Sequence, residues 1–547
     1  MDTDSSNDRL DSWKEIAVYL KRDKRTIQRW EAHEGLPIHR KLHDRLASIY
    51  AYKSELDMWW RGSHSRPATA VESSLPRRPL LAVLPLRNLS GNSDEEYFSD
   101  GLTEELISQL SRIHPAQLGV IARGSTVKYK GAQTDLNRIA RELGASYILD
   151  GSVRRSNNRV RIAIQLIEVS DSGHLWADSY DRDLSDILQL QDEVAGAVTT
   201  QIAGQLVTHN QNGLQHGRRV APKAYEAYLR GRVFWGQRNP IALGRAVTFF
   251  QESISFDSSY APAYAGLADS YSALASMALG AFSPSEVMPK AKTAAVRAVE
   301  LDSGLAEANA SLALVELFYE WNWERAASLF ERALKLNAGS GAGRQWYAEY
   351  LGSSGRISEA IRELHTAQEV DPLSLTIPGA LATMYYFDRN YDEAIALSRR
   401  TLEGEPDFVL ATLNLGRAYE QKKMYRQAIA HLSVVRERHP DSTAVLMELG
   451  RLFAASGKGH EARQLIGSLK RLARKRYVPA FHFAAIHAAL GDHDQAFIWL
   501  QRAREERCDY LVYLDREPAA DKIRRDPRYA AIVPHAPDHG GTGVAGR

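Results

Sequence analysis

The sequence predicts a multidomain protein with three parts: a small helix-turn-helix head, an α/β block and an all-α superhelix of repeats. The head is predicted by two short amphipathic helices near the N-terminus, followed by two short strand patterns. The α/β block is predicted because strand-sized and helix-sized apolar patterns alternate from residue 79 to about residue 210. The repeats are predicted by alanines that recur every 34 residues from Ala326 to Ala496.

Composition excludes several classes of protein. A net charge of +2 over 547 residues argues against a uniformly basic nucleic-acid coat, so any contact with DNA must be local. Cys508 is the single cysteine, so an intramolecular disulfide is impossible, as suits a reducing cytoplasm. The polar, acidic N-terminus does not resemble a signal peptide, and no apolar run approaches the length of a membrane span. We therefore expect a cytoplasmic protein that does not enter a membrane.

The head is predicted from residues 12–60. Ser12 followed by Glu15 forms a capping box, which predicts that a helix begins at Trp13. A second helix is predicted over residues 24–33, and in a helix-turn-helix this helix enters the major groove. Its outward residues, which can contact bases and phosphates, are Lys24, Arg25, Thr26, Gln28 and Arg29.

A β-hairpin wing is predicted to follow, with strands over residues 36–41 and 47–51, and then a third helix over residues 53–60. The whole stretch resembles the excisionase-like or MerR-like winged helix-turn-helix family through KEIAVYL, RTIQRW, GLPIHR and YAYKSELDMWW. The resemblance implies base reading by the second helix and backbone or minor-groove contact by the wing. The wing residues expected to contact DNA are His39, Arg40 and Lys41.

A blander interpretation treats the charges of the head as a solvated face. Residues 21–45 hold eight Lys or Arg against four Asp or Glu, which is a modest excess for binding DNA. His33, His39 and His43 fit no zinc-ligand spacing, and no cysteine lies nearby, so no metal is predicted.

The α/β block is predicted over residues 79–210, after a linker over residues 62–78. Expected elements are a strand over 80–86, a helix over 96–113, a hairpin turning at Asn157-Asn158 and a closing helix over 187–206. The block resembles the TolB-like (FlgO-like) N-terminal domain through the segments LAVLPLRNLSG, EYFSDGLTEELISQLSRI, ARELGASYILDGSVRR and HLWADSYDRDL. That family carries no agreed chemistry. Arg123, Ser125 and Thr126 after a strand form a hypothetical anion site.

The repeats are predicted over residues 220–508 as about eight units. A 34-residue period with small residues at the helix crossings resembles the tetratricopeptide repeat, which implies a superhelix whose groove binds a peptide or a partner protein. Residues 509–533 are expected to form a C-terminal cap, and residues 534–547 a disordered tail. Candidate groove residues are Arg344, Tyr347, Asn414 and Arg417, although most aromatic side chains at repeat positions are expected in the core.

These patterns favour a cytoplasmic transcriptional regulator that binds double-stranded DNA through its head and a signal or protein partner through the rest. A small head reads a short site, so we expect a homodimer or clustered sites. The alternative is a tetratricopeptide scaffold without sequence-specific DNA binding. No HExxH, GxSxG or phosphate-loop motif is present, so neither an enzyme nor a cofactor is predicted.

Overall fold

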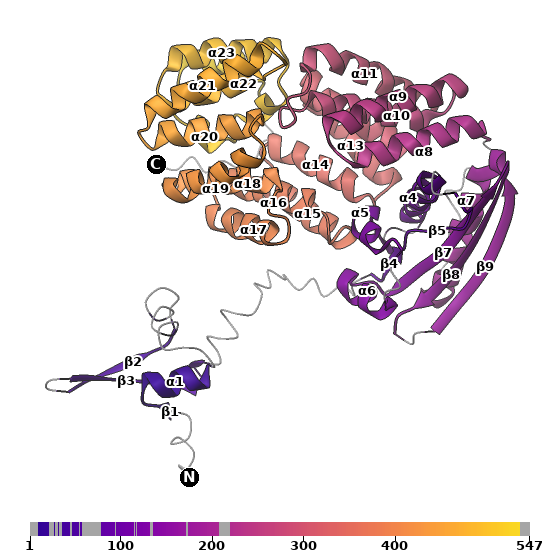
Figure 1. Cartoon of the computed structure of the whole chain (residues 1–547), viewed down its shortest axis with the longest axis horizontal. Coiled ribbons are helices and arrows are strands. Elements are labelled where there is room, and N and C mark those ends of the chain that lie inside the picture. The colour runs from indigo at the N-terminus through magenta and orange to yellow at the C-terminus, as the bar shows by residue number, and fades with distance from the viewer. Residues whose placement is uncertain are drawn as a thin grey trace. The chain divides into compact units, whose positions relative to one another are not determined.

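The computed structural model divides the chain into two compact units, Met1–Arg77 and Arg78–Arg547, which are called the head and the body below (Figure 1). The residues that the structure describes are 9–20, 27, 31, 36–43, 46–53, 55–56, 78–92, 95–113, 115, 117–131, 135–170, 173–206 and 219–536.

The head contains a small antiparallel sheet with the strand order β1-β3-β2 and a helix, α1, spanning Trp13–Tyr19. The helix begins where the sequence predicts, because the backbone N–H of Glu15 donates to Ser12 Oγ at 3.2 Å. The strands are β1 (Arg9–Leu10), β2 (His39–His43) and β3 (Leu46–Tyr52). The buried core of the head consists of Leu10, Ile16, Leu20, Ile27, Leu36, Ile49, Ala51 and Leu56.

Two details of the head differ from the sequence prediction. The first wing strand begins at His39 instead of residue 36, which is consistent with Pro37, because proline cannot donate a ladder hydrogen bond. Strand β1 was not predicted; Arg9 pairs with Tyr52, and a polar two-residue segment has no strand pattern to detect. Of the predicted second helix the structure describes Ile27 and Glu31, and both are helical.

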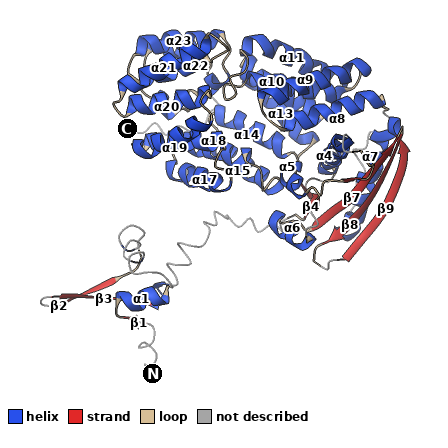
Figure 2. Cartoon of the chain, viewed as in Figure 1, coloured by secondary structure: helices blue, strands red, loops and turns tan. Residues whose placement is uncertain are grey.

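The body begins with a mixed sheet in the order β6-β4-β7-β8-β9, with β5 also paired to β7 (Figure 2). Strand β4 pairs in parallel with β6 and β7, whereas β7, β8 and β9 form an antiparallel meander. The strands are β4 (Leu80–Val83), β5 (Arg87–Asn88), β6 (Gly119–Ile121), β7 (Tyr147–Ser156), β8 (Arg159–Glu168) and β9 (Gly173–Asp183).

Several predicted features of this sheet are confirmed. The β7–β8 hairpin turns at Asn157-Asn158, and Asn157 has a φ of 53°. The register of β8 against β9 shifts between Leu166 and Ile167, where the pairing skips Leu175 of β9. Strand β4 is shorter than the predicted span of residues 80–86 and ends at Val83, two residues before Pro85.

Helices cover both faces of the sheet because successive strand residues point to opposite sides. Leu81 and Val83 of β4 share a core with α4 (Glu96–Arg112) and α7 (Ile187–Leu206), close to their predicted bounds. Ala82 of β4 faces the other way, toward α6 (Leu136–Leu143). Figure 1 shows α4 between the sheet and α8, the first helix of the array.

The array consists of eight helical hairpins between residues 219 and 536, in agreement with the predicted repeats. The six alanines spaced by 34 residues from Ala326 to Ala496 are all fully buried, as helix-crossing positions require. The helices are α8 (Pro222–Gly236), α9 (Pro240–Phe256), α10 (Ala261–Ala275), α11 (Pro284–Leu301), α12 (Ala306–Val315), α13 (Trp323–Leu336), α14 (Gly341–Ser353), α15 (Ile357–Val370), α16 (Thr376–Phe387), α17 (Tyr391–Gly404), α18 (Val409–Gln421), α19 (Tyr425–Arg438), α20 (Thr443–Ala455), α21 (Gly459–Ala473), α22 (Ala480–Ala489) and α23 (His493–Glu505).

The segment after α23 reaches further into the array than a terminal cap would. It contains two short 3₁₀ helices, Asp509–Tyr513 and Pro518–Ala520, and α24 (Pro527–Ile532). Part of it packs on the last repeat. The Tyr513 ring, however, also contacts Phe318 and Phe387 in the interior. The carboxylate of Asp509 accepts the backbone N–H of Met277, 232 residues earlier in the chain.

Candidate nucleic-acid interface and the interior of the array

The β2–β3 hairpin occupies the place of the predicted wing, and His39 at its base contacts Glu55 and Tyr50. Its Nε2 lies 2.6 Å from Glu55 Oε2, and its ring stacks on Tyr50 with centroids 5.1 Å apart. The guanidinium of Arg9 lies 4.1 Å from the same Tyr50 ring. The His39 side chain remains 40% exposed, so it is anchored at the hairpin base and still accessible.

The other predicted DNA-contacting residues are not placed by the structure. Arg40 and Lys41 lie in β2, but their side chains fall outside the described part of the chain. The predicted second-helix set also lies outside the described residues: Lys24, Arg25, Thr26, Gln28 and Arg29. For these seven residues the DNA-binding role stays a prediction from the sequence.

In the body, the sheet domain and the array share one continuous core. Phe98 and Leu102 of α4 belong to the same buried cluster as Tyr225 and Leu229 of α8. The two helices approach closely at Gly101, where an added Cβ would lie 2.7 Å from Leu229 Cδ2. Such an approach tolerates no side chain without a shift of its neighbours. The sheet domain and the array therefore pack as one structure.

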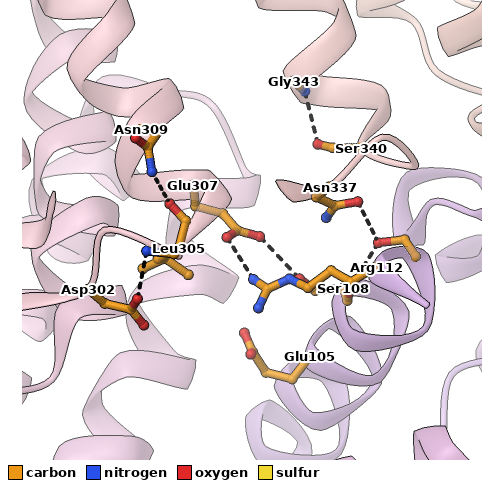
Figure 3. A network of polar contacts seen from close by, with 12 residues as sticks. Glu105, Ser108, Arg112, Asp302, Leu305, Glu307, Asn309, Asn337, Ser340 and Gly343 are labelled. Carbon is orange, nitrogen blue, oxygen red and sulfur yellow. Dashed lines mark hydrogen bonds and ion pairs between the residues drawn. The ribbon is translucent and has the colours of Figure 1, made fainter. Parts of the chain in front are cut away.

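A network of polar contacts borders this core at the C-terminal end of α4 (Figure 3). Arg112 forms an ion pair of 2.8 Å with Glu307 of α12, and Ser108 Oγ donates to the same carboxylate at 3.1 Å. Ser111 Oγ donates to Asn337 Oδ1, beside the loop before α14. Burial raises the pKa of Glu307, but Arg112, Arg232 and a backbone hydrogen bond together outweigh burial, and the net pKa is lowered.

The pKa values of two neighbouring carboxylates of α4 are shifted in opposite directions. Glu104 is flanked by Arg232 of α8 and by Arg123, and these cations outweigh burial and lower its pKa. Glu105 accepts a 2.8 Å hydrogen bond from the hydroxyl of Tyr228, and burial raises its pKa. Both carboxylates are therefore engaged by α8 at the junction.

The hypothetical anion site after β6 is corrected by these contacts. Ser125 Oγ donates to Asp371 Oδ1 at 2.6 Å and accepts the backbone N–H of Leu373 at 2.8 Å. Arg123 lies 3.7 Å from the carboxylates of both Asp100 and Glu104. The polar groups proposed for an anion instead bind the loop between α15 and α16 and the acids of α4.

Three of the candidate groove residues are engaged by neighbouring groups of the array. Arg344 of α14 forms an ion pair of 2.5 Å with Glu363 of α15, and Tyr347 stacks on Tyr350 of the same helix. Asn414 is fully buried and donates to the carbonyl oxygen of Gly379 at 2.8 Å. Asn414 therefore joins two adjacent repeats, whereas the contacts of Arg344 and Tyr347 lie within one repeat.

A buried ion network joins the later repeats to the C-terminal segment. Arg451 lies 2.6 Å from Glu420 and 3.5 Å from Glu448, and Arg417 lies 3.4 Å from Glu448. Glu517 enters the network from the C-terminal segment and accepts hydrogen bonds from the hydroxyls of Tyr386 and Tyr510. Burial raises the pKa of Glu517, but Arg451 and Arg417 outweigh burial and lower it overall.

The interior of the array contains a cavity of about 350 Å³, called the central cavity below. It is bounded by the first helices of successive repeats, from α8 to α20, and by residues 507–513 of the C-terminal segment. Its wall is largely apolar, with aromatic side chains from several repeats. Pockets of this size hold small organic molecules in other proteins.

Two searches of the described residues gave negative findings. No described helix is both long and apolar enough to cross a membrane. No group of three or more His, Cys, Asp or Glu side chains is arranged to hold a metal ion in the described ranges.

Comparisons with known families identify two parts of the body. Residues 77–197 match the model of the second domain of HilA/YgeH-like transcriptional regulators. Residues 388–447 match the tetratricopeptide repeat. The first match spans the sheet domain and the second falls within the array.

Curated relatives match parts of the chain in sequence. A protein named putative adenylate cyclase 3, from Rhizobium meliloti, is 39% identical over 193 residues, which are 35% of this chain and 32% of that protein. Transcriptional regulator HilA of Salmonella typhimurium is 23% identical over 340 residues, covering 61% of this chain and 58% of HilA. The chain therefore spans about a third of the first relative and under two thirds of the second.

Solved structures also resemble the body. PilF of Pseudomonas aeruginosa is 20% identical, with a TM-score of 0.31, and covers 40% of this chain and 92% of its own. The human IFIT1 dimer with m7Gppp-AAAA is 16% identical, with a TM-score of 0.40, and covers 57% of this chain and 77% of its own. By the family matches, the chain carries a HilA-like regulator domain and tetratricopeptide repeats.

Proposed function

We propose that this protein is a transcriptional regulator that binds double-stranded DNA through its head and a partner or signal through its body. The observation that carries the proposal is the similarity to transcriptional regulator HilA over 61% of the chain. That similarity is accompanied by a match to the second domain of HilA/YgeH-like regulators over residues 77–197.

The head supplies the DNA-binding part of the proposal. A helix that follows a capping box, a β-hairpin and a small apolar core are the parts that a winged helix-turn-helix needs. We assign base reading to the second-helix set, with Arg25 and Arg29 as the principal residues, and phosphate or minor-groove contact to Arg40 and Lys41. The resemblance of the head to excisionase-like or MerR-like domains is part of this proposal.

The body supplies the partner-binding part. Tetratricopeptide arrays bind peptides and proteins through their concave face, so a protein partner is the natural occupant of surfaces left open by the C-terminal segment. The TolB-like assignment of the sheet domain, cytoplasmic location and a homodimer that doubles the recognised site are further parts of the proposal.

We also propose that the chain has no catalytic activity of its own. The relative named as a putative adenylate cyclase shares only 32% of its length with this chain, so its printed activity does not transfer with the match. Incubation of the purified chain with ATP and Mg²⁺ or Mn²⁺ should yield no cyclic AMP. Sustained formation of cyclic AMP would contradict this part of the proposal.

Selection of genomic fragments with the full chain tests the DNA-binding function. Fragments retained by the wild-type protein should share a short motif. The Arg25→Ala/Arg29→Ala variant should retain no motif, because paired hydrogen bonds to base edges are lost. The matched control is Arg426→Ala/Arg436→Ala, which removes two arginines from α19 in the array and should leave the motif unchanged. Failure to enrich a motif, with protein partners captured by the body, would favour the scaffold alternative.

A further inference from the structure

The central cavity is lined by charged groups with few direct partners. Most of its polar side chains form hydrogen bonds or ion pairs: Asp509 accepts the Met277 N–H, Arg417 pairs with Glu448, Asp269 accepts from Ser311 and Arg507 donates to the Tyr319 carbonyl oxygen. Arg238 and Glu349 differ, because in the described part of the chain Arg238 stacks on Trp235, Glu349 accepts from Gln345, and neither forms an ion pair within 4 Å. Both line the cavity.

Arg238 lies just beyond the end of α8. Its backbone has a φ of 52°, and its guanidinium lies 3.7 Å from the ring of Trp235. This stacking holds the guanidinium over the ring, while the exposed Arg238 side chain keeps N–H donors that no described residue uses and that a ligand can reach. Trp235 Nε1 and Ser272 Oγ, which line the same cavity, are buried and likewise lack a hydrogen-bond partner among the described residues. Unused donors of this kind suit an anionic group.

Glu349 offers the opposite charge from α14. Its only described side-chain hydrogen bond comes from Gln345 Nε2 at 3.2 Å. Burial raises the pKa of Glu349 to about 7, and the opposing effects of Gln345 and of Arg238 offset only part of this rise. A cationic group beside Glu349 would offset the free-energy cost of burying a charged carboxylate, so the carboxyl would ionise.

The rest of the cavity wall is largely apolar. Phe318, Met288 and Leu314 line the cavity from the earlier repeats, and Met384 and Phe387 line it from α16. Methionine side chains adapt to ligands of varied outline, and the aromatic rings provide flat contact area. An occupant therefore needs an apolar body as well as charges of both signs.

We propose that the central cavity binds a free α-amino acid with a large apolar side chain, whose carboxylate is held by Arg238 and whose ammonium is held by Glu349. Trp235 Nε1–H and Ser272 Oγ–H complete the donors for the carboxylate. The apolar side chain packs against the methionine and aromatic wall. Residues 507–513 bound the same cavity, so the C-terminal segment forms part of the ligand site.

This ligand class follows from the balance of the unpaired groups. A simple anion would satisfy Arg238 and leave Glu349 without a cation, and a simple amine would do the reverse. A nucleic acid is disfavoured because Asp269, Glu349 and Asp509 all line the cavity and would oppose phosphates. The proposal is independent of DNA binding and adds a ligand to the regulator proposed above.

Titration calorimetry with the full chain, in the absence of DNA, tests the site. The probes are L-phenylalanine and L-leucine, with phenylacetate and phenethylamine as analogues that carry one charge each. The amino acids should bind saturably, and each single-charge analogue should bind at least about ten-fold more weakly, the effect of one lost charge-assisted hydrogen-bond pair.

Two variants locate the binding. Arg238→Gln and Glu349→Gln should each weaken L-phenylalanine binding by about ten-fold or more. The matched controls are Arg426→Gln and Glu437→Gln, which change exposed residues of α19 away from the cavity and should leave affinity unchanged. Thermal melts without ligand confirm that each variant is folded.

Three results would overturn the proposal. The first is absence of saturable binding of both amino acids to the wild-type chain. The second is equal affinity for phenylacetate or phenethylamine, which would show that only one charge is recognised. The third is equal weakening by the α19 controls. Because no DNA is present, any of these results leaves the proposed regulator function to be decided separately.

Discussion

Replacing Arg451 by Met should destabilise the array strongly, because this guanidinium balances several buried carboxylates. The Arg451 side chain is 5% exposed, while Glu448 and Glu420, its two ion-pair partners, are 0% and 11% exposed. Arg451 also lowers the pKa of Glu517 from the C-terminal segment. The variant leaves these three carboxylates with Arg417 as their remaining close cation.

The expected loss is about 3–5 kcal/mol in the free energy of unfolding, the usual cost of leaving a buried charge without its partner. The loss depends on pH. Without Arg451 the buried carboxyls have raised pKa values, so their ionisation opposes folding as the pH rises through those values. The deficit should therefore be larger at pH 8 than at pH 5.

Urea unfolding followed by circular dichroism at 222 nm measures the effect. The matched control is Arg438→Met, which breaks the exposed contact with Asp407, where the two side chains are 50% and 61% exposed. An exposed pair is worth about 0–1 kcal/mol, so the control should barely shift the urea midpoint. Equal losses in the two variants, or a deficit independent of pH, would refute the account of the buried network.

Two further predictions concern packing and a buried histidine. Gly101→Ala should destabilise the body, because its Cβ would meet Leu229 at under 3.0 Å, whereas Gly244→Ala in open space on α9 should stabilise by about 0.5–1 kcal/mol. Equal effects in thermal melts would contradict the close packing of α4 on α8. His482 is fully buried, and burial lowers its pKa to about 3. As the pH falls below 6.5, His482 takes up a proton in the unfolded chain but not in the folded chain, so the wild type loses stability. His482→Leu lacks this proton uptake. Its free energy of unfolding should therefore rise by about 2 kcal/mol relative to the wild type between pH 8 and pH 5. A stability difference that does not change with pH in urea titrations would exclude this explanation.

Periodic features of the fold could be predicted from the sequence because they repeat or alternate. The alanines from Ala326 to Ala496 are buried at helix crossings, and the β7–β8 hairpin turns at Asn157-Asn158. The capping box at Ser12 also forms as predicted. In each case a local pattern has a single structural consequence.

Features that depend on tertiary contact could not be predicted in this way. Nothing local indicates that Asp509 meets Met277, 232 residues away, or that Ser125 is held by Asp371. That Arg238 and Glu349 line one cavity becomes apparent only once the repeats are folded together. Apart from His39, the side chains of the predicted DNA-contacting set lie outside the described part of the chain, so their role stays a prediction from the sequence.

The central claim, that this chain reads DNA sequence, is tested most directly by competition binding. A labelled site from the genomic selection is displaced from the full chain by unlabelled copies of the same site or of a scrambled one, at two salt concentrations. We expect the selected site to compete about 10³-fold better, with affinity that falls steeply with salt, and we expect Arg25→Ala/Arg29→Ala to erase the difference. Equal competition by the scrambled site would contradict the account.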